Sequence, residues 1–326
     1  MTILITGAAG FIGSHLAQAL LARGERVVGL DNFNDYYDPA RKRANVRAIE
    51  ETAQARGELT HFSLVEGDIR DEATVQEIFS TQRPMAIVHA AAMAGVRRSV
   101  QQPLLYEDVN VRGTLVLLEA ARKHETANFV CISSSSVYGN NSPVPFREDA
   151  LCDWPLSPYP ATKRAAELMC ATYHHLYDLP CTCLRLFTVL GPRGRPDMTP
   201  YHFTESIVQG REITLFDPDS VQRDFTYVGD IVQGILAALE AKLPFEIVNL
   251  GNHRPVGLRD YVAIIERLVG KPARVRVEPL PPTDARVTCA DIGKAQRLLG
   301  FAPATPVEEG LARFWDWYRA NVMRET

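Results

Sequence analysis

The chain has 326 residues and a formal net charge of −4 at pH 7, with 46% hydrophobic and 23% charged residues. That balance is ordinary for a globular protein, and the absence of a Lys/Arg block gives no support to nucleic-acid binding. No apolar run approaches the roughly 20 residues that span a bilayer, and no basic leader precedes the first apolar residues, so we expect no membrane partner.

The six cysteines and eight histidines show no spacing that is typical of a disulfide framework or a metal site. The sequence contains no CxxC pair and no HExxH pattern. We therefore expect reduced, mostly buried cysteines, a cytoplasmic location and no bound metal.

Short apolar runs alternate with amphipathic stretches in the first half of the chain, which is typical of a parallel sheet covered by helices. Strands are expected at 3–6, 26–30, 61–68, 86–90 and 128–133, each followed by a helix, and a further strand at 181–187 continues the sheet. In the first helix, apolar residues recur at helical spacing.

The regular alternation of strands and helices ends after residue 187. Residues 191–200 are rich in glycine and proline, which predicts an irregular loop. A helix near 201–210, a short strand at 213–216 and a loop over 217–225 are expected next. A helix at 227–241 and a strand at 245–250 then resemble the earlier units.

The segment GAAGFIGSH lies directly between the first strand and the first helix, with glycines at Gly7, Gly10 and Gly13. Glycines there permit a tight turn and a close approach to a pyrophosphate, which the helix N-terminus attracts. Asp31 ends the next strand, where an acid can accept hydrogen bonds from both ribose hydroxyls and repel a 2′-phosphate. The pattern predicts NAD and not NADP, although the cations at 41–43 could accommodate a phosphate.

We expect an α/β fold with a Rossmann-type doubly wound parallel sheet and a smaller C-terminal α/β substrate lobe. Residues 1–187 are expected to form the NAD-binding domain, with 225–252 returning to it, and 188–224 and 253–326 to form the lobe. Asp68 either borders the adenine pocket or caps the helix that follows, and both interpretations stay open.

Tyr159 and Lys163 are four residues apart at the start of a predicted helix and so share one face. A tyrosine ordinarily loses its proton near pH 10, and a neighbouring ammonium group stabilises the phenolate, which makes this pair a candidate general acid/base. The serine run at 133–136 follows a predicted strand, where parallel folds place their sites, so a serine there can bind the same substrate hydroxyl.

With GAAGFIGSH, HAAA at 89–92, SSSSVYG at 133–139 and YPATK at 159–163 in this order, the chain resembles the extended short-chain dehydrogenase/reductases, and within them the nucleotide-sugar epimerases. The segments 31–43, 94–99 and 187–198 are similar to those of UDP-glucuronate 4-epimerases. The resemblance covers essentially the whole chain. It implies an isomerase that uses NAD to epimerise carbon 4 of UDP-glucuronate through a transient 4-keto sugar.

The resemblance also implies roles for particular residues. The catalytic set is Ser134, Tyr159 and Lys163. The expected cofactor-binding residues are Gly7, Gly10, Phe11, Ile12, Gly13, Asp31, Asn32, Asp68, Ile69, Ala90, Ala91, Ala92, Tyr159 and Lys163. The expected substrate-binding residues are Arg97, Ser135, Ser136, Thr188, Arg195, Arg223 and Asp284, of which Thr188 and Arg195 face the sugar carboxylate and Arg223 the diphosphate.

Three features of the sequence depart from patterns in related enzymes. Family members often carry Gln or Arg and then Pro-Gly before the aspartate at 284, where this chain has Pro281, Pro282 and Thr283. Arg286 stands where a small or apolar residue is usual. Relatives that decarboxylate or dehydrate their substrate place a glutamate before VYG, where this chain has Ser136, which argues against those reactions.

Other functions and partners stay open. The nearest alternative is a 4-epimerase of a neutral UDP-sugar such as UDP-glucose or UDP-N-acetylglucosamine, followed by a nucleotide-sugar decarboxylase or dehydratase, and then a non-catalytic NAD-binding regulator. For Arg195, a salt bridge that braces the loop is the alternative to carboxylate binding. Segments 103–123 and 159–178 are apolar on more than one face, which favours either a homodimer or packing against the sheet.

Overall fold

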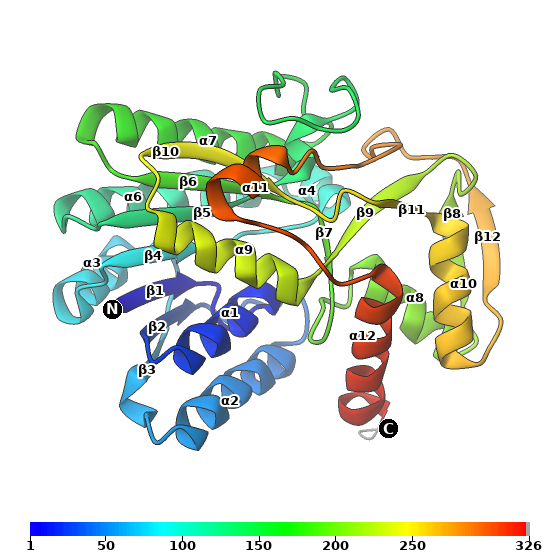
Figure 1. Cartoon of the computed structure of the whole chain (residues 1–326), viewed down its shortest axis with the longest axis horizontal. Helices are drawn as coiled ribbons and strands as arrows, with labels where there is room; N and C mark the ends of the chain where they lie inside the picture. Colours follow the sequence, from blue (N-terminus) through cyan, green and yellow to red (C-terminus); the bar gives the residue numbers. More distant parts are fainter. Residues whose placement is uncertain (324–326) are drawn as a thin grey trace.

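The computed structural model describes residues 1–323 and is built around a seven-stranded parallel sheet with the strand order β10-β6-β5-β4-β1-β2-β3 (Figure 1). The strands are β1 Thr2–Thr6, β2 Arg26–Asp31, β3 Phe62–Glu66, β4 Ala86–His89, β5 Asn128–Ser134, β6 Cys181–Leu186 and β10 Phe245–Leu250. These bounds lie within two residues of the sequence prediction at each end, and the predicted doubly wound fold is confirmed.

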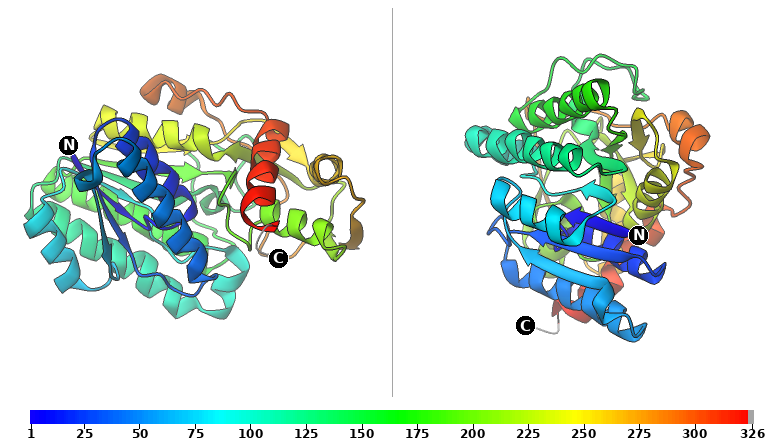
Figure 2. Two further views of the ribbon diagram at one scale, coloured as in Figure 1. Left: turned by 90° about the horizontal axis from the view of Figure 1, so that it is seen from below. Right: turned by 90° about the vertical axis from the view of Figure 1, so that its left-hand side faces the viewer.

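Helices cover both faces of this sheet, which explains why its central strands are almost continuously apolar. One face carries α1 (Phe11–Ala22), α2 (Pro39–Ala55) and α9 (Val228–Ala241). The other carries α3 (Glu72–Gln82), α6 (Gly113–Lys123) and α7 (Pro158–Tyr177) (Figure 2). Each face has its own cluster of buried apolar residues, so β1, β4, β5 and β6 lie between two packed layers.

The direction in which the chain winds reverses at β1, which pairs with β2 on one side and with β4 on the other. At such a switch point the connections after the two neighbouring strands diverge and leave a crevice at the carboxyl ends of the strands. The loops after β1, β4 and β5 therefore converge on one edge of the sheet.

A smaller lobe follows the crevice and contains two short sheets with the orders β11-β9-β7 and β12-β8. Its strands are β7 Thr188–Leu190, β8 Glu212–Phe216, β9 Gln222–Tyr227, β11 Pro255–Gly257 and β12 Arg274–Glu278. Its helices are α8 Thr199–Val208, α10 Leu258–Val269 and α12 Val307–Asn321, and α11 Gly293–Leu299 packs back against α9 and β10. The lobe has a third apolar core of its own.

Of these five strands only β8 was expected, and β7 and β9 illustrate why the others were missed. Residues 217–225 were predicted as a loop, but β9 begins at Gln222, and no strand was predicted at 188–190. The two segments pair with each other in parallel, with Thr188 opposite Phe225. Each is short and is stabilised by a partner far away in the sequence, so neither carries a clear local pattern. The division into two domains stays a prediction.

Four of the remaining short helices contact α7, and the fifth, which precedes β3, contacts α2. These are α4 (Val96–Gln101), α5 (Pro103–Glu107) and the single turns η1 Leu59–His61, η2 Asp108–Arg112 and η3 Ser135–Tyr138. The stretch expected as one helix over 103–123 is divided by the π-helical turn η2. Within residues 1–323, each helix is too short or too polar to cross a lipid bilayer.

The six cysteines are all buried and carry free thiols. The sulfur atoms of Cys131, Cys170 and Cys183 lie within 4.8 Å of one another, although the residues come from β5, α7 and β6. Sequence spacing gave no sign of this cluster, because the fold brings together positions that are far apart along the chain.

A buried ion pair fixes α7 against the sheet. Glu167 is completely buried and accepts hydrogen bonds from Arg185 Nε at 2.9 Å and Nη2 at 2.8 Å in β6, and from Ser133 Oγ at 2.6 Å in β5. Burial works to lower the pKa of Arg185, but the contact with Glu167 outweighs it and leaves that pKa above its ordinary value. Arg185 therefore depends on Glu167 as the partner of its buried charge.

Replacing Glu167 by alanine is expected to reduce the free energy of unfolding by about 3–5 kcal/mol, because Arg185 would stay buried without its partner. Denaturant-induced unfolding followed by circular dichroism measures this change. Glu309→Ala is the control: it removes an exposed ion pair with Arg313 on α12 and should change stability by less than about 1 kcal/mol. Equal losses in the two variants would contradict the role assigned to the buried pair.

Candidate active site

A cavity of about 970 Å³ opens at the switch point, between the carboxyl edge of the large sheet and the smaller lobe. It runs from Gly7 and Asp31 at one end to Arg223 and Asp284 at the other. Its size is at the upper end of the range for small-molecule sites, which suits an extended ligand or two ligands in contact. Every residue that was predicted from the sequence to bind the cofactor or the substrate, or to take part in catalysis, lines this cavity. Their individual roles stay predictions.

In the loop between β1 and α1, glycines let the backbone pack directly against neighbouring backbone. Gly7 has φ +70°, and a Cβ atom there would lie 2.8 Å from the amide nitrogen of Ala91. A Cβ atom on Gly13 would lie 2.2 Å from the carbonyl oxygen of Gly7. Helix α1 begins at Phe11 without a side-chain cap, so the amides of its first turn are available to a ligand. This end of the cavity fits a pyrophosphate.

Asp31 stands at the end of β2 and is held firmly. Its carboxylate accepts hydrogen bonds from the amides of Ala9 at 3.2 Å and Phe33 at 2.9 Å, and Lys42 Nζ lies 3.5 Å away. Of the three cations at 41–43, only Lys42 lines the cavity, because Arg41 bonds Tyr201 and Arg43 pairs with Glu66. Since Lys42 is already paired with Asp31, the local charge does not favour an additional phosphate.

Asp68 also lines this end of the cavity, and Asp71, not Asp68, caps the following helix α3. Asp68 accepts hydrogen bonds from Arg70 Nη2 at 2.7 Å and Asn32 Nδ2 at 2.9 Å. The hydrogen bonds from Arg70 lower the pKa of Asp68 to about 2, against an opposing effect of burial. Asp68 is therefore an anionic part of the cavity wall at neutral pH.

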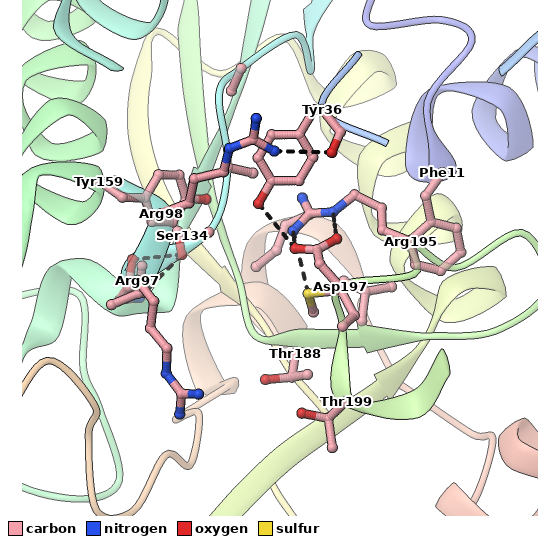
Figure 3. Close-up of a pocket in the computed structure, with 18 of the residues that line it drawn as sticks. Phe11, Tyr36, Arg97, Arg98, Ser134, Tyr159, Thr188, Arg195, Asp197 and Thr199 are labelled. Atoms are coloured by element: carbon pink, nitrogen blue, oxygen red, sulfur yellow. Dashed lines mark hydrogen bonds and ion pairs between the residues drawn. The ribbon is translucent and has the colours of Figure 1, made fainter. Parts of the chain in front are cut away.

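The middle of the cavity holds the predicted catalytic set, brought together by α7 and the end of β5 (Figure 3). Lys163 is buried and donates a hydrogen bond from Nζ to the carbonyl oxygen of Ile132 at 2.8 Å. Ser134 Oγ lies 2.9 Å from Ser136 Oγ and accepts from the Ser136 amide at 3.2 Å. Tyr159 is half-buried and packs edge to face against Tyr106, with 6.2 Å between ring centroids. These groups can exchange a proton with a hydroxyl bound between them.

The sequence prediction missed two polar residues that contact Arg195. Asp197 forms a bidentate ion pair with Arg195, and Tyr36 donates a hydrogen bond from its hydroxyl to Asp197 Oδ2 at 3.1 Å. Burial works to lower the pKa of Arg195, but Asp197 holds it above its ordinary value. Tyr36 and Asp197 lie within the segments 31–43 and 187–198, so the sequence pointed to the segments but not to these side chains.

Two arginines and one carboxylate occupy the far end of the cavity. Arg97 donates to Asp284 Oδ2 at 2.8 Å and stacks on Phe216 at 4.4 Å, and Phe216 is another residue that the sequence prediction missed. Burial lowers the pKa of Arg223, and Arg97 lowers it further, whereas Asp284 raises it. The three groups leave one positive charge in excess, which fits a diphosphate.

The unusual Arg286 turns away from this end. Its guanidinium group bonds Ser220 and lies 3.6 Å from Asp217, and its side chain does not line the cavity. Its backbone carbonyl accepts a hydrogen bond from Arg223 Nη1 at 3.0 Å. The departure at this position therefore leaves Arg223 in place.

The chain is similar to known proteins both in sequence and in overall structure. Residues 3–251 match the NAD dependent epimerase/dehydratase family. The chain is 41% identical over 320 residues to a UDP-glucuronate 4-epimerase of Thermodesulfobacterium geofontis, covering 98% of this chain and 96% of that one.

Two solved structures are similar over nearly the whole chain. A UDP-glucuronic acid 4-epimerase of Bacillus cereus, in complex with UDP-glucuronic acid and NAD, has a TM-score of 0.88 and 35% identity, covering 98% of this chain and 99% of that one. A UDP-glucose 4-epimerase of Thermotoga maritima, with UDP-glucose, has a TM-score of 0.88 and 30% identity, covering 99% of this chain and all of that one.

Proposed function

Because the chain belongs to the NAD-dependent epimerase/dehydratase family, we propose that it is an isomerase that uses NAD to convert UDP-glucuronate into UDP-galacturonate at carbon 4. One observation carries this proposal. A single cavity joins the glycine turn at Gly7, the set around Tyr159 and the arginine at 195. These three parts correspond to a dinucleotide, an oxidisable hydroxyl and a carboxylate.

NAD supplies the acceptor, and in its reduced form the donor, of the hydride at carbon 4. The residues present fit it: the glycine turn and the first turn of α1 would hold its pyrophosphate, and Asp31 would accept hydrogen bonds from a ribose. A Cβ atom on Gly7 would lie within 3.0 Å of three backbone atoms of Ala90 and Ala91, so this turn is already packed as closely as backbone allows.

In the proposed mechanism Tyr159, as the phenolate, takes the proton of the hydroxyl on carbon 4, and Ser134 orients that hydroxyl. Lys163, on the same helix as Tyr159, is held in place by its hydrogen bond to the Ile132 carbonyl oxygen. Arg97 and Arg223 keep the diphosphate bound while the 4-keto sugar rotates in the cavity and presents its opposite face. Tyr159 then returns the proton to the carbon 4 oxygen, which now lies on the opposite side of the sugar ring.

The carboxylate creates a competing reaction, because the 4-keto form of the substrate is a β-keto acid. The bond from carbon 5 to the carboxylate breaks if it aligns with the π system of the ketone. Its electron pair then forms an enolate, carbon dioxide leaves, and the enolate takes up a proton. We infer that Arg195, Thr188, Ser135 and Ser136 hold the carboxylate out of this alignment, since an arginine fork matches a carboxylate.

The alternatives are disfavoured by specific residues. A decarboxylase or dehydratase would lack its acid/base carboxylate, because Ser136 occupies that position and bonds Ser134. A neutral UDP-sugar would give Arg195 no charged partner in the substrate. A regulator without catalysis would have no need of the complete set of Ser134, Tyr159 and Lys163. We place the reaction in the cytoplasm, which the six free cysteines support.

Purified protein incubated with UDP-glucuronate, without added reductant, is expected to form a product of unchanged mass and new retention time, matching UDP-galacturonate. Chromatography with mass detection measures it. Tyr159→Phe should reduce turnover by at least about a hundredfold, because the acid/base is lost while the fold and the cavity remain. Turnover of UDP-glucose, with none of UDP-glucuronate, would favour the neutral-sugar alternative.

Replacing Asp31 by asparagine is expected to weaken NAD binding about tenfold or more, because a charged acceptor for the ribose hydroxyls is lost. NADP binding should not weaken, since the repulsion of its 2′-phosphate is removed. Calorimetric titration with each dinucleotide measures both changes without reference to turnover. Glu66→Gln, which removes a charge at the end of neighbouring β3 outside the cavity, is the control and should change neither affinity.

A homodimer is proposed from an exposed apolar surface over α5 and α7, which contact each other. Leu104 is 82% exposed, and Leu168 and Leu176 are 50% and 58% exposed on α7. Leucines exposed to this degree on adjacent helices are typical of a surface covered by a partner. A second copy of the chain is the partner that the apolar segments 103–123 and 159–178 favour.

Leu168→Glu is expected to convert the dimer into a monomer, because a charge would have to be buried at the centre of the contact. Light scattering coupled to size exclusion measures the mass of each variant. Leu59→Glu, at an exposed apolar residue remote from α7, is the control and should leave the mass unchanged. A wild-type mass equal to that of one chain would contradict the proposal.

A further inference from the structure

We propose that Asp197 and Tyr36 are positioning residues for Arg195, which set the orientation of the sugar carboxylate and so decide between epimerisation and loss of carbon dioxide. This inference rests on the proposed function and deepens it. In this proposal, two further side chains control how often the intermediate loses carbon dioxide. Both residues lie in the cavity wall beside Arg195 (Figure 3).

The contact between Arg195 and Asp197 fixes the plane of the guanidinium group. Nε lies 3.0 Å from Oδ1 and Nη2 lies 2.9 Å from Oδ2, so the pair is bidentate. A guanidinium has five N–H donors in a rigid fork, and this pair uses two of them along one edge. The Nη1 side of Arg195 is left to meet a substrate carboxylate, in a plane that Asp197 determines.

Tyr36 in turn fixes Asp197. Its hydroxyl donates to Oδ2 at 3.1 Å, and burial raises the pKa of Tyr36, which keeps that hydroxyl protonated. A Cβ atom on Gly95 would lie only 2.5 Å from the Tyr36 hydroxyl oxygen, and Gly95 has φ +98°. A side chain at position 95 would therefore have to displace the Tyr36 hydroxyl that bonds Asp197.

Tyr36 is itself held from two sides. Arg98 stacks on its ring at 4.3 Å and donates from Nη1 to its carbonyl oxygen at 3.0 Å. The Tyr36 amide donates to Asn34 Oδ1 at 3.3 Å, and Lys42 Nζ donates to the same oxygen at 3.0 Å. The support of Arg195 thus extends from the sugar end of the cavity into the segment that follows Asp31.

The charges show that this group orients a carboxylate more than it attracts one. Asp197 stays ionised, because Arg195 holds its pKa below the ordinary value although burial opposes this. The ion pair is neutral overall, so most of the attraction that a free arginine would exert on an anion is cancelled. Removing the charge of Asp197 should therefore not weaken substrate binding, while it should release the orientation of Arg195.

A role confined to bracing the loop is distinguishable, because the loop over 191–198 has a separate brace outside the cavity. Arg193 donates from Nη2 to Gln18 Oε1 at 2.6 Å, and the carbonyl oxygen of Pro192 bonds His15 Nε2 at 2.9 Å. Arg193 does not line the cavity. Arg193→Met is therefore a matched control that loosens the same loop without touching the carboxylate site.

The experiment compares wild type, Tyr36→Phe, Asp197→Asn and Arg193→Met with UDP-glucuronate as substrate. It measures kcat and KM for UDP-galacturonate together with released carbon dioxide and the UDP-pentose product. For Asp197→Asn we expect kcat to fall about ten- to hundredfold, KM to stay level or fall, and the decarboxylated fraction to rise. Tyr36→Phe should change the same quantities in the same direction, but less.

Arg193→Met is expected to lower the unfolding temperature and to leave the ratio of the two products at the wild-type value. If wild type epimerises UDP-glucuronate but both Tyr36→Phe and Asp197→Asn keep its ratio of the two products, the positioning role is overturned. The proposed function then stays intact. A rise in KM for Asp197→Asn without more decarboxylation would also overturn the positioning role. Wild type that does not act on UDP-glucuronate would overturn the proposed function, and this inference with it.

Discussion

The buried contact of Glu167 with Arg185 and Ser133 is the constraint on which the active site depends. Tyr159, Lys163 and Glu167 follow one another at four-residue intervals and therefore lie along one face of α7. Glu167 joins that face to β5 and β6, and Lys163 joins it to the carbonyl of Ile132. Once these contacts are made, α7 can neither slide nor rotate, so the position of Tyr159 relative to Ser134 is determined by the core.

Around this core, the two ends of the cavity are built by different means. At the end lined by Gly7 and Gly13 the wall is made of backbone, because these glycines leave no room for a side chain. Around Arg195 and Arg223 the wall is made of side chains, which the lobe and the loops of the large sheet contribute together. In the proposed reaction NAD stays bound while the sugar intermediate rotates. A rigid backbone wall suits the bound dinucleotide, and a wall of polar side chains suits the rotating sugar.

Two arginines of the cavity are each paired with a carboxylate. Arg97 pairs with Asp284, and Arg195 pairs with Asp197. In a chain with a net charge of −4, such pairs provide direction without a large local field. This arrangement is consistent with the proposed reaction, in which the site would hold an anionic sugar in one orientation and let its diphosphate-bound intermediate rotate.

The sequence by itself determined the parallel sheet, the glycine turn, Asp31 and the pair of Tyr159 and Lys163, because each depends on spacing within one strand, helix or turn. The tertiary structure alone decided the rest. Strands β7 and β9 exist because they pair with each other, and Tyr36 meets Asp197 across 161 positions of the chain. Contacts of this kind depend on how loops from separate units meet, which no local period in the sequence records.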